Sequence, residues 1–246
     1  MPLNNSYDEQ EVIKAIATAL ETFYANLIEK IDGLNIKKVM KRKNPYLYRA
    51  KAMQSASEIV ESVLTAFVSS SEETIFGNCF FEPIAIAASG GNKALAEGID
   101  IMIQDNATNT ISAIAVKSGP SVFNADSKKR QEQNFMAASK LAQQAKARYE
   151  AYIGYCYGKK KDSGRGKPKM YQELAGKRFW AELTGDEDFY IKIIGYMGTM
   201  PEKYVADYKE SYNKAANRLV REFSNSFCKE DVSIDWEKLV EFNSGD

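Results

Sequence analysis

Two alternating apolar segments constrain this chain more than any other feature of its sequence. In Gly98–Gln104 and in Ile111–Lys117, apolar residues alternate with others, and the residues between the two segments are all small or polar. This pattern predicts two adjacent strands joined by a short loop. The first strand carries Asp100 and the second ends on Lys117. A buried charge without a partner is costly, so we expect these two side chains to lie together.

Helical periodicity flanks this predicted hairpin on both sides. We expect an amphipathic helix over Asp8–Ile31, and a second helix over Met53–Phe67. The Ser69–Thr74 segment reads as the start of a further helix that continues through Phe80, because a serine cap is followed by first-turn acids. Pro83 is expected to kink that helix.

The second half of the chain is expected to alternate between helix and strand. A helix from about Ala125 to Tyr149 is predicted, followed by a third strand at Tyr152–Tyr157 and by helical segments from Phe179 to the C-terminus. Four residues are expected to face inward from the first of these helices: Phe135, Ala138, Leu141 and Ala145.

The composition excludes several classes of enzyme. The 246 residues contain no histidine, which rules out Ser-His-Asp triads and zinc sites that use histidine. No apolar stretch is long enough to span a membrane, and the N-terminal residues lack the features of an export signal. The three cysteines are read as reduced thiols. We therefore expect a cytoplasmic protein.

Two basic segments stand out although the formal net charge is zero. The segment Lys37–Lys51 has seven lysines and arginines and no acid, and Lys159–Lys169 has six against a single acid. Each segment is either a solvated surface or a contact for the phosphates of a nucleic acid, and the pattern leaves both readings open.

The predicted hairpin also suggests a particular chemistry. Hydrolysis of a phosphodiester with Mg²⁺ requires oxygen ligands for the ion and a means of activating water. An Asp on one strand and a Glu-any-Lys pattern on its neighbour meet these needs, because residues two apart in a strand share a face.

At this point the sequence resembles the PD-(D/E)XK nuclease superfamily, and within it a type II restriction endonuclease family. The similarity covers most of residues 40–190, and the segments that carry it are Lys43-Asn44-Pro45-Tyr46-Leu47, Ser70–Gly77, Gly98-Ile99-Asp100-Ile101, Lys117-Ser118-Gly119-Pro120, Asn124, Phe179-Trp180 and Gly185-Asp186. The Asp and Lys alone would be a weak signal, but the additional segments in the same order make it considerably stronger.

The resemblance implies an α/β fold with a restriction-endonuclease-like mixed central sheet flanked by helices, and additional N- and C-terminal helices. It implies one nuclease-like domain over residues 1–246, with its core at about 52–158, a helical extension at 7–50 and a helical part at 175–246. The implied activity is Mg²⁺-dependent cleavage of specific double-stranded DNA, by a homodimer.

The resemblance also implies the site residues. Asp100, Lys117 and the motif position Ala115 are the expected catalytic positions, and Asp100 and Glu73 are the expected metal ligands. DNA contacts are expected from Lys43, Asn44, Tyr46, Ser118, Asn124, Arg130, Lys160, Arg165 and Lys167. For Asn124, Arg130 and the Lys159–Lys169 segment, a plain surface role is the alternative.

One position departs from the motif. Ala115 stands two residues before Lys117, where the pattern requires Glu or Asp, and alanine cannot bind a metal. Three explanations stay open: an engineered variant that binds DNA without cutting it, a carboxylate supplied by Glu73 or Glu82 on a helix, or a naturally inactive binder. The alternative function is therefore a non-catalytic DNA-binding protein on the same fold.

Overall fold

The computed structural model describes residues 3–4, 6–94, 96–160 and 169–245. The strands in these ranges form one mixed sheet with the order β1-β2-β3-β4-β5. The strands are β1 (Asn92–Lys93), β2 (Ile101–Asp105), β3 (Thr110–Lys117), β4 (Arg148–Tyr155) and β5 (Gln172–Ala175). β1, β2 and β3 pair antiparallel, whereas β3, β4 and β5 pair parallel. The predicted hairpin is thus confirmed as β2 and β3.

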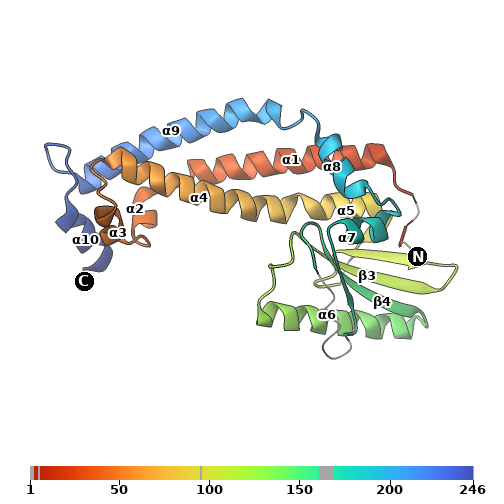
Figure 1. The fold of residues 1–246 in the computed structure, drawn as a ribbon. Coiled ribbons are helices and arrows are strands. Elements are labelled where there is room, and N and C mark those ends of the chain that lie inside the picture. The colour runs from red at the N-terminus through yellow and green to blue at the C-terminus, as the bar shows by residue number, and fades with distance from the viewer. Residues whose placement is uncertain (1–2, 5, 95, 161–168, 246) are drawn as a thin grey trace. The chain divides into compact units, whose positions relative to one another are not determined.

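Helices cover both faces of the sheet (Figure 1). Helix α6 (Ala125–Gln144) lies against one face, and α5 (Phe81–Ser89) and α7 (Lys177–Thr184) lie against the other. Residues of β3 and β4 alternate between these faces. The face toward α6 buries Ala113, Ala115, Ile153 and Tyr155 against Phe135 of α6. The expected α/β class, a mixed sheet flanked by helices, is therefore confirmed.

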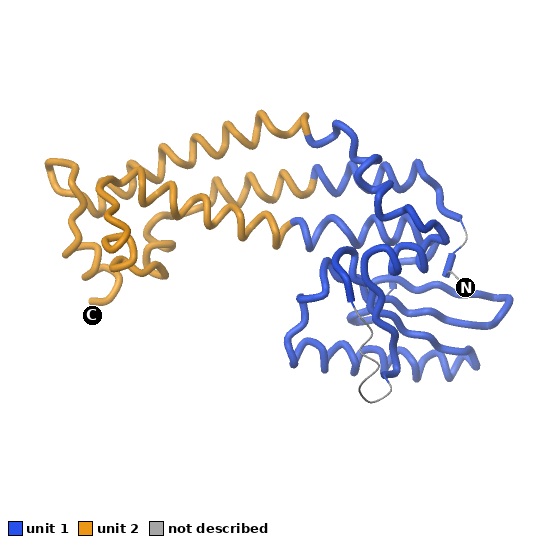
Figure 2. Tube along the Cα trace, in the orientation of Figure 1, with its two compact units in different colours: residues 1–21, 76–201 blue, residues 22–75, 202–246 orange. Residues whose placement is uncertain are grey.

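The chain divides into two compact units (Figure 2). Unit 1 is residues 1–21 and 76–201, and unit 2 is residues 22–75 and 202–246. Unit 1 holds the whole sheet, α5, α6, α7 and α8 (Phe189–Met197). Two helices, α1 (Glu9–Asp32) and α4 (Ala56–Cys79), run through both units. A single domain over the whole chain stays a prediction, because two units joined by continuous helices can fold together or separately.

Unit 2 is helical over the part of the chain that the structure describes. It contains α2 (Ile36–Met40), α3 (Pro45–Ala50), α9 (Glu202–Phe227), α10 (Trp236–Ser244) and the greater part of α4. The additional N- and C-terminal helices that the sequence predicted are thus present. Side chains from the C-terminal helices bind the N-terminal segment: Arg218 donates to the Leu34 carbonyl at 2.7 Å, and Asn243 donates to the Met40 carbonyl at 2.9 Å.

The predicted helix start at Ser69–Thr74 is wrong. α4 runs without a break from Ala56 to Cys79, and Ser71 is buried within it. Val68 and Ile75 are buried on either side of the serines, and this packing outweighs the tendency of serine to cap a helix. The break comes instead between α4 and α5, so Pro83 lies in the first turn of α5, where proline is tolerated because the backbone N–H needs no helical partner.

The predicted helix to Tyr149 is too long. α6 ends at Gln144, and Lys146 follows with a φ of +54°. From Arg148 the chain pairs with β3, since a strand neighbour satisfies its backbone groups better than a further helical turn. Leu141, expected to face inward, is 61% exposed, and Ala145 is also exposed, while Ala142 is buried in their place. Phe135 and Ala138 are buried as expected.

Smaller differences concern the strands. β2 begins only at Ile101, because Gly98 turns the chain with a φ of +69°. The ladder extends to the Asp105–Thr110 pair, so the loop between β2 and β3 is shorter than expected. β1 and β5 were not predicted. No helix in the described ranges is long and apolar enough to cross a membrane.

The contact between Gly154 and α7 provides a test of this packing. A Cβ atom at Gly154 in β4 would overlap the ring of Phe179, which is 1% exposed. We expect Gly154→Ala to lower the free energy of unfolding by about 1–3 kcal/mol, the usual effect of overpacking a core. The measurement is urea denaturation.

Gly195→Ala is the matched control, because a Cβ there meets nothing within 4 Å in helix α8. Alanine exceeds glycine in helix propensity, so this variant should be as stable as the parent or more stable. Equal midpoints for the two variants would contradict the packing of Phe179 on Gly154.

Candidate active site

Asp100 closes the end of the β2–β3 pairing. The last pair of the ladder is Ile101 with Ile114, and Asp100 is the residue before it. The Asp100 backbone N–H donates to the Ile114 carbonyl at 2.9 Å, and its carboxylate Oδ2 accepts the Val116 N–H at 2.6 Å. These two hydrogen bonds lie on either side of Ala115 in β3. On the β2 side, Val116 has no paired residue, and the Asp100 carboxylate accepts its N–H instead.

Lys117 shares the same carboxylate. Its Nζ lies 3.2 Å from Asp100 Oδ2 and 2.9 Å from the Val116 carbonyl oxygen, to which it also donates. The side chains of Lys117 and Asp100 are 26% and 20% exposed, so the pair is only partly shielded from solvent. The structure thus brings together the two charged residues that the motif predicted, as a neutral pair that solvent can reach.

Ala115 occupies the third position of the motif. It is fully buried, and the register places it beside Asp100 on one side and opposite Ile153 on the other. Its side chain faces α6, in the same cluster as Phe135. Since strand residues two apart share a face, a longer side chain at this position would lie on the same side as Lys117. A methyl group leaves this position without an oxygen.

The residues present fit a Mg²⁺ site only in part. The Asp100 carboxylate and the Val116 carbonyl are suitable oxygen ligands, and both contact the Lys117 ammonium, so a positive charge already lies between them. Within the described ranges, no three Asp, Glu, Cys or His residues are grouped so that they could hold a metal. The donor set is one carboxylate short of the motif.

Glu82 and Lys93 extend the charge network of Asp100. Glu82 of α5 forms an ion pair with Lys93 of β1 at 3.0 Å. The hydrogen bond and the charge of Glu82 raise the pKa of Lys93, and the charge of Asp100 adds to this effect. Glu82 and Asp100 thus both act on the charge of Lys93, and the role of Glu82 as a substitute carboxylate stays a prediction. Glu73, the expected metal ligand, lies on α4 in unit 2, and its role stays a prediction.

A buried carboxylate that the sequence did not indicate, Glu173, lies on the same face of the sheet. The register places Glu173 opposite Ile153, which is itself opposite Ala115. Two strand spacings therefore separate Glu173 from the motif position, roughly 10 Å between Cα atoms. Glu173 was missed because β5 is short and follows a basic, glycine-containing segment, so no alternation marks it as a strand.

Lysines surround this carboxylate. The Glu173 side chain is 8% exposed and forms ion pairs with Lys128, Lys160 and Lys169, and the Tyr155 hydroxyl donates to it at 2.9 Å. Burial opposes ionisation of Glu173, but the hydrogen bonds from the lysines and the tyrosine more than offset it and hold its pKa at about 2. The Glu173 carboxylate is thus already occupied by the lysines and the tyrosine, so it is not free to bind a metal ion.

The DNA contacts predicted in unit 1 fall at several places. Ser118 follows β3, and its carbonyl accepts the Tyr157 N–H at 3.0 Å. Asn124 caps α6 by accepting the Ser127 N–H at 2.8 Å. Arg130 forms an ion pair with the exposed Glu97. Asn124 therefore has a structural role without DNA. The DNA roles of these residues and of Lys160 stay predictions.

The remaining predicted contacts lie elsewhere. Arg165 and Lys167 are outside the described residues. In unit 2, Asn44 caps α3 by accepting the Tyr46 N–H at 3.0 Å, and Tyr46 is 63% exposed. Lys43 lies between α2 and α3 and lines a groove described below. Lys43, Asn44 and Tyr46 thus belong to unit 2, whereas Asp100 belongs to unit 1, and their DNA roles stay predictions.

The lowered pKa of Glu173 predicts a pH dependence of stability. A carboxylate whose pKa falls from 4.5 to about 2 on folding stabilises the fold above pH 4.5, and this stabilisation is lost as the pH falls toward 2. The expected contribution at neutral pH is about 3 kcal/mol. Glu173→Gln should remove it and flatten the stability profile in this pH window, as measured by urea denaturation at a series of pH values.

Glu97→Gln is the control, because Glu97 also pairs with a basic residue but is exposed. It should leave the profile close to that of the parent. An unchanged profile in Glu173→Gln would show that the lysine cluster does not stabilise the fold.

Comparison with known protein families gives a match over most of the chain. Residues 10–204 match the family described as type II restriction endonuclease EcoO109I. The match covers far more than half of the chain and includes Asp100, Ala115, Lys117 and Glu173. No curated protein matches the sequence.

Proposed function

Because this chain belongs to the type II restriction endonuclease EcoO109I family, we propose that it binds specific double-stranded DNA through a cleavage centre that lacks one carboxylate. In this proposal it holds DNA and cuts it poorly or not at all. The observation that carries the proposal is the fully buried Ala115, beside Asp100 and two residues before Lys117. We also propose a homodimer in the cytoplasm, since two copies most simply read a two-fold symmetric site.

The charges present support binding rather than cleavage. When bound, Mg²⁺ supplies an activated water and neutralises charge on the phosphate. The oxygen ligands present are one carboxylate fewer than the motif requires. The Lys117 ammonium already neutralises Asp100, and no second carboxylate from β3 repels a phosphate. We therefore expect the pair to accept a DNA phosphate without a divalent ion, with Lys117 as the donor to a phosphate oxygen.

One observation favours a second function, an active Mg²⁺-dependent endonuclease. Glu82 contacts Lys93, and Lys93 in turn is within electrostatic reach of Asp100. If Lys93 releases Glu82 when DNA binds, Glu82 and Asp100 together provide the two carboxylates that the motif requires. Cleavage by the parent chain would then depend on Glu82.

Restoring the motif carboxylate is the first test. We expect Ala115→Glu to cleave phage DNA into discrete fragments with Mg²⁺. Its rate should exceed that of the parent at least about 100-fold, because loss of a residue that only hydrogen-bonds to a metal ligand can already cost that factor. Gel electrophoresis of time points measures the rate. Ala115→Gln is the matched control, because it has the same size without the charge and should remain inactive.

Other outcomes separate the two functions. Parent activity equal to that of Ala115→Glu, abolished by Glu82→Gln, would establish the active enzyme and reject the incomplete centre. Absence of cleavage by every form, with both variants folded by circular dichroism, would reject Ala115 as the cause of inactivity.

Metal dependence of binding is the second test. The parent should bind a pool of duplexes with a randomised central segment equally well in EDTA and in Ca²⁺. Ala115→Glu adds an anion near the phosphate, so its Kd in EDTA should rise by roughly tenfold, and Ca²⁺ should restore the affinity. Fluorescence anisotropy gives both values. A parent chain that needs Ca²⁺ to bind would contradict a centre neutralised by Lys117.

A further inference from the structure

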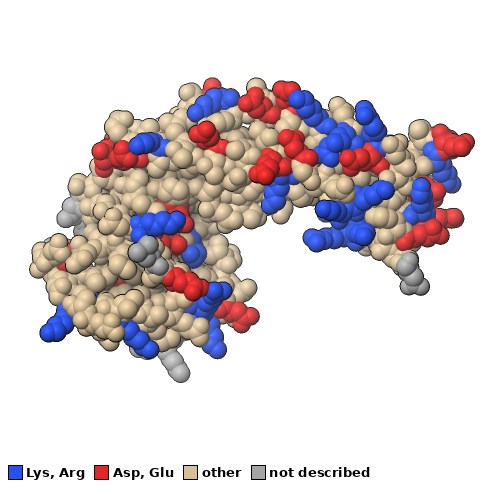
Figure 3. Space-filling view, turned by 180° about the vertical axis from the view of Figure 1, so that it is seen from behind, with Lys and Arg blue, Asp and Glu red and all other residues tan. Residues whose placement is uncertain are grey.

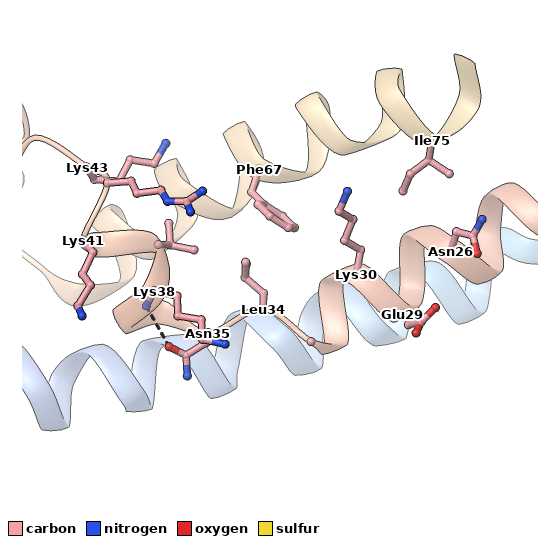
Figure 4. Close-up of a pocket in the computed structure, with 13 residues that line it drawn as sticks. Asn26, Glu29, Lys30, Leu34, Asn35, Lys38, Lys41, Lys43, Phe67 and Ile75 are labelled. Carbon is pink, nitrogen blue, oxygen red and sulfur yellow. Dashed lines mark hydrogen bonds between the residues drawn. The ribbon is translucent and has the colours of Figure 1, made fainter. Parts of the chain in front are cut away.

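A basic surface lies in unit 2, far in the sequence from Asp100, Ala115 and Lys117. A groove of about 960 Å³ is bordered by α2, the turns on either side of it, the end of α1, and α4. Its floor is apolar, with Leu34 and Phe67 pointing toward one another (Figure 4). Five of the residues that line it are basic: Lys30, Lys38, Lys41, Arg42 and Lys43. Glu29 is the one acid among the residues that line it.

In the part of the chain that the structure describes, these basic side chains form no ion pair with a carboxylate, unlike the lysines around Glu173. Among the described residues, none of the seven lysines and arginines of 37–51 has a carboxylate within 4.0 Å. By contrast, three lysines meet one carboxylate at Glu173. Figure 3 shows lysine and arginine side chains gathered at the part of unit 2 that contains α2 and α3. Unpaired like charges that are held together repel one another and attract an anion.

The backbone of this basic segment is fixed by the C-terminal helices. Arg218 of α9 donates to the carbonyls of Leu34 at 2.7 Å and Asp32 at 3.0 Å, at the end of α1. Asn243 of α10 donates to the carbonyls of Met40 and Lys43, both at 2.9 Å. Side-chain hydrogen bonds thus hold the backbone before and after α2, although the charges of this part of the chain repel one another. A binding surface preorganised in this way loses little entropy when a ligand binds.

We propose that this groove binds the phosphodiester backbone of DNA, independently of base sequence. This inference rests on the proposed function, which supplies DNA as the anion. Several basic side chains along one groove suit a ligand with regularly spaced phosphates, and the apolar floor can contact the sugars. Since phosphate contacts position a duplex without reading it, the groove contributes affinity and register but no specificity.

The test compares two triple variants that remove the same charge. The groove variant combines Lys38→Gln, Lys41→Gln and Arg42→Gln. The control variant combines Lys209→Gln, Lys229→Gln and Arg221→Gln, which are exposed residues of unit 2 outside the groove. The probe is a 30-base-pair duplex of random sequence, and its Kd is measured by anisotropy over a series of salt concentrations.

The groove variant should bind roughly tenfold or more weakly, and its salt slope should decrease by up to about 2.7, since each lost phosphate contact removes about 0.9. The control should match the parent in both values. Equal slopes for all three proteins would overturn the groove while leaving DNA binding intact. A parent that binds no duplex at low salt would instead reject the proposed function, and the groove with it.

A measurement on the parent chain avoids any dependence on the folding of variants. Acetylation of lysines, read by mass spectrometry, should slow at Lys30, Lys38, Lys41 and Lys43 when the duplex is present, and should not slow at Lys209. Protection of Lys209 to the same extent would overturn the proposal. So would equal protection of the groove lysines by a poly-glutamate peptide, because the groove would then take an acidic polypeptide as readily as DNA.

Discussion

The hydrogen bond from the Val116 N–H to the Asp100 carboxylate is the interaction on which the candidate active site depends. It satisfies a backbone N–H of β3 beyond the last residue that pairs with β2, and it fixes the carboxylate beside Lys117. A single side chain therefore completes the sheet and supplies the charge of the site. For this reason the site keeps its geometry although Ala115 contributes no ligand. Loss of a metal ligand at this position does not require loss of the fold.

Charge is distributed in two different ways along this chain, which belongs to the EcoO109I family. On the α6 face of the sheet, lysines surround a buried carboxylate, and the lysine of the motif contacts an aspartate. In the segment from Lys37 to Lys51, positive charges have no acidic partner among the described residues. The formal net charge of zero hides this difference. Where acids lie relative to bases is therefore more informative for this protein than their totals.

The sequence predicted the centre of the fold better than its edges. The β2–β3 hairpin and the Asp100–Lys117 pair were predictable, because alternation and the need to neutralise a buried charge are local signals. The true course of α4 through Ser71 was not, since tertiary packing decided against a local cap. Glu173 escaped notice because its lysine partners come from α6 and from both sides of residues 161–168. No spacing in the sequence reveals such a convergence.

The division into units has a consequence for folding during synthesis on the ribosome. Unit 2 is made from residues 22–75 and from residues 202–246, so its N-terminal helices cannot complete their packing until α9 and α10 have been synthesised. By then every strand of the sheet has already been synthesised. Chains usually fold from the N-terminus as they emerge, whereas here the middle of the chain can fold first. Until its last helices arrive, the basic segment near the N-terminus is without Arg218 and Asn243, the side chains that fix its backbone.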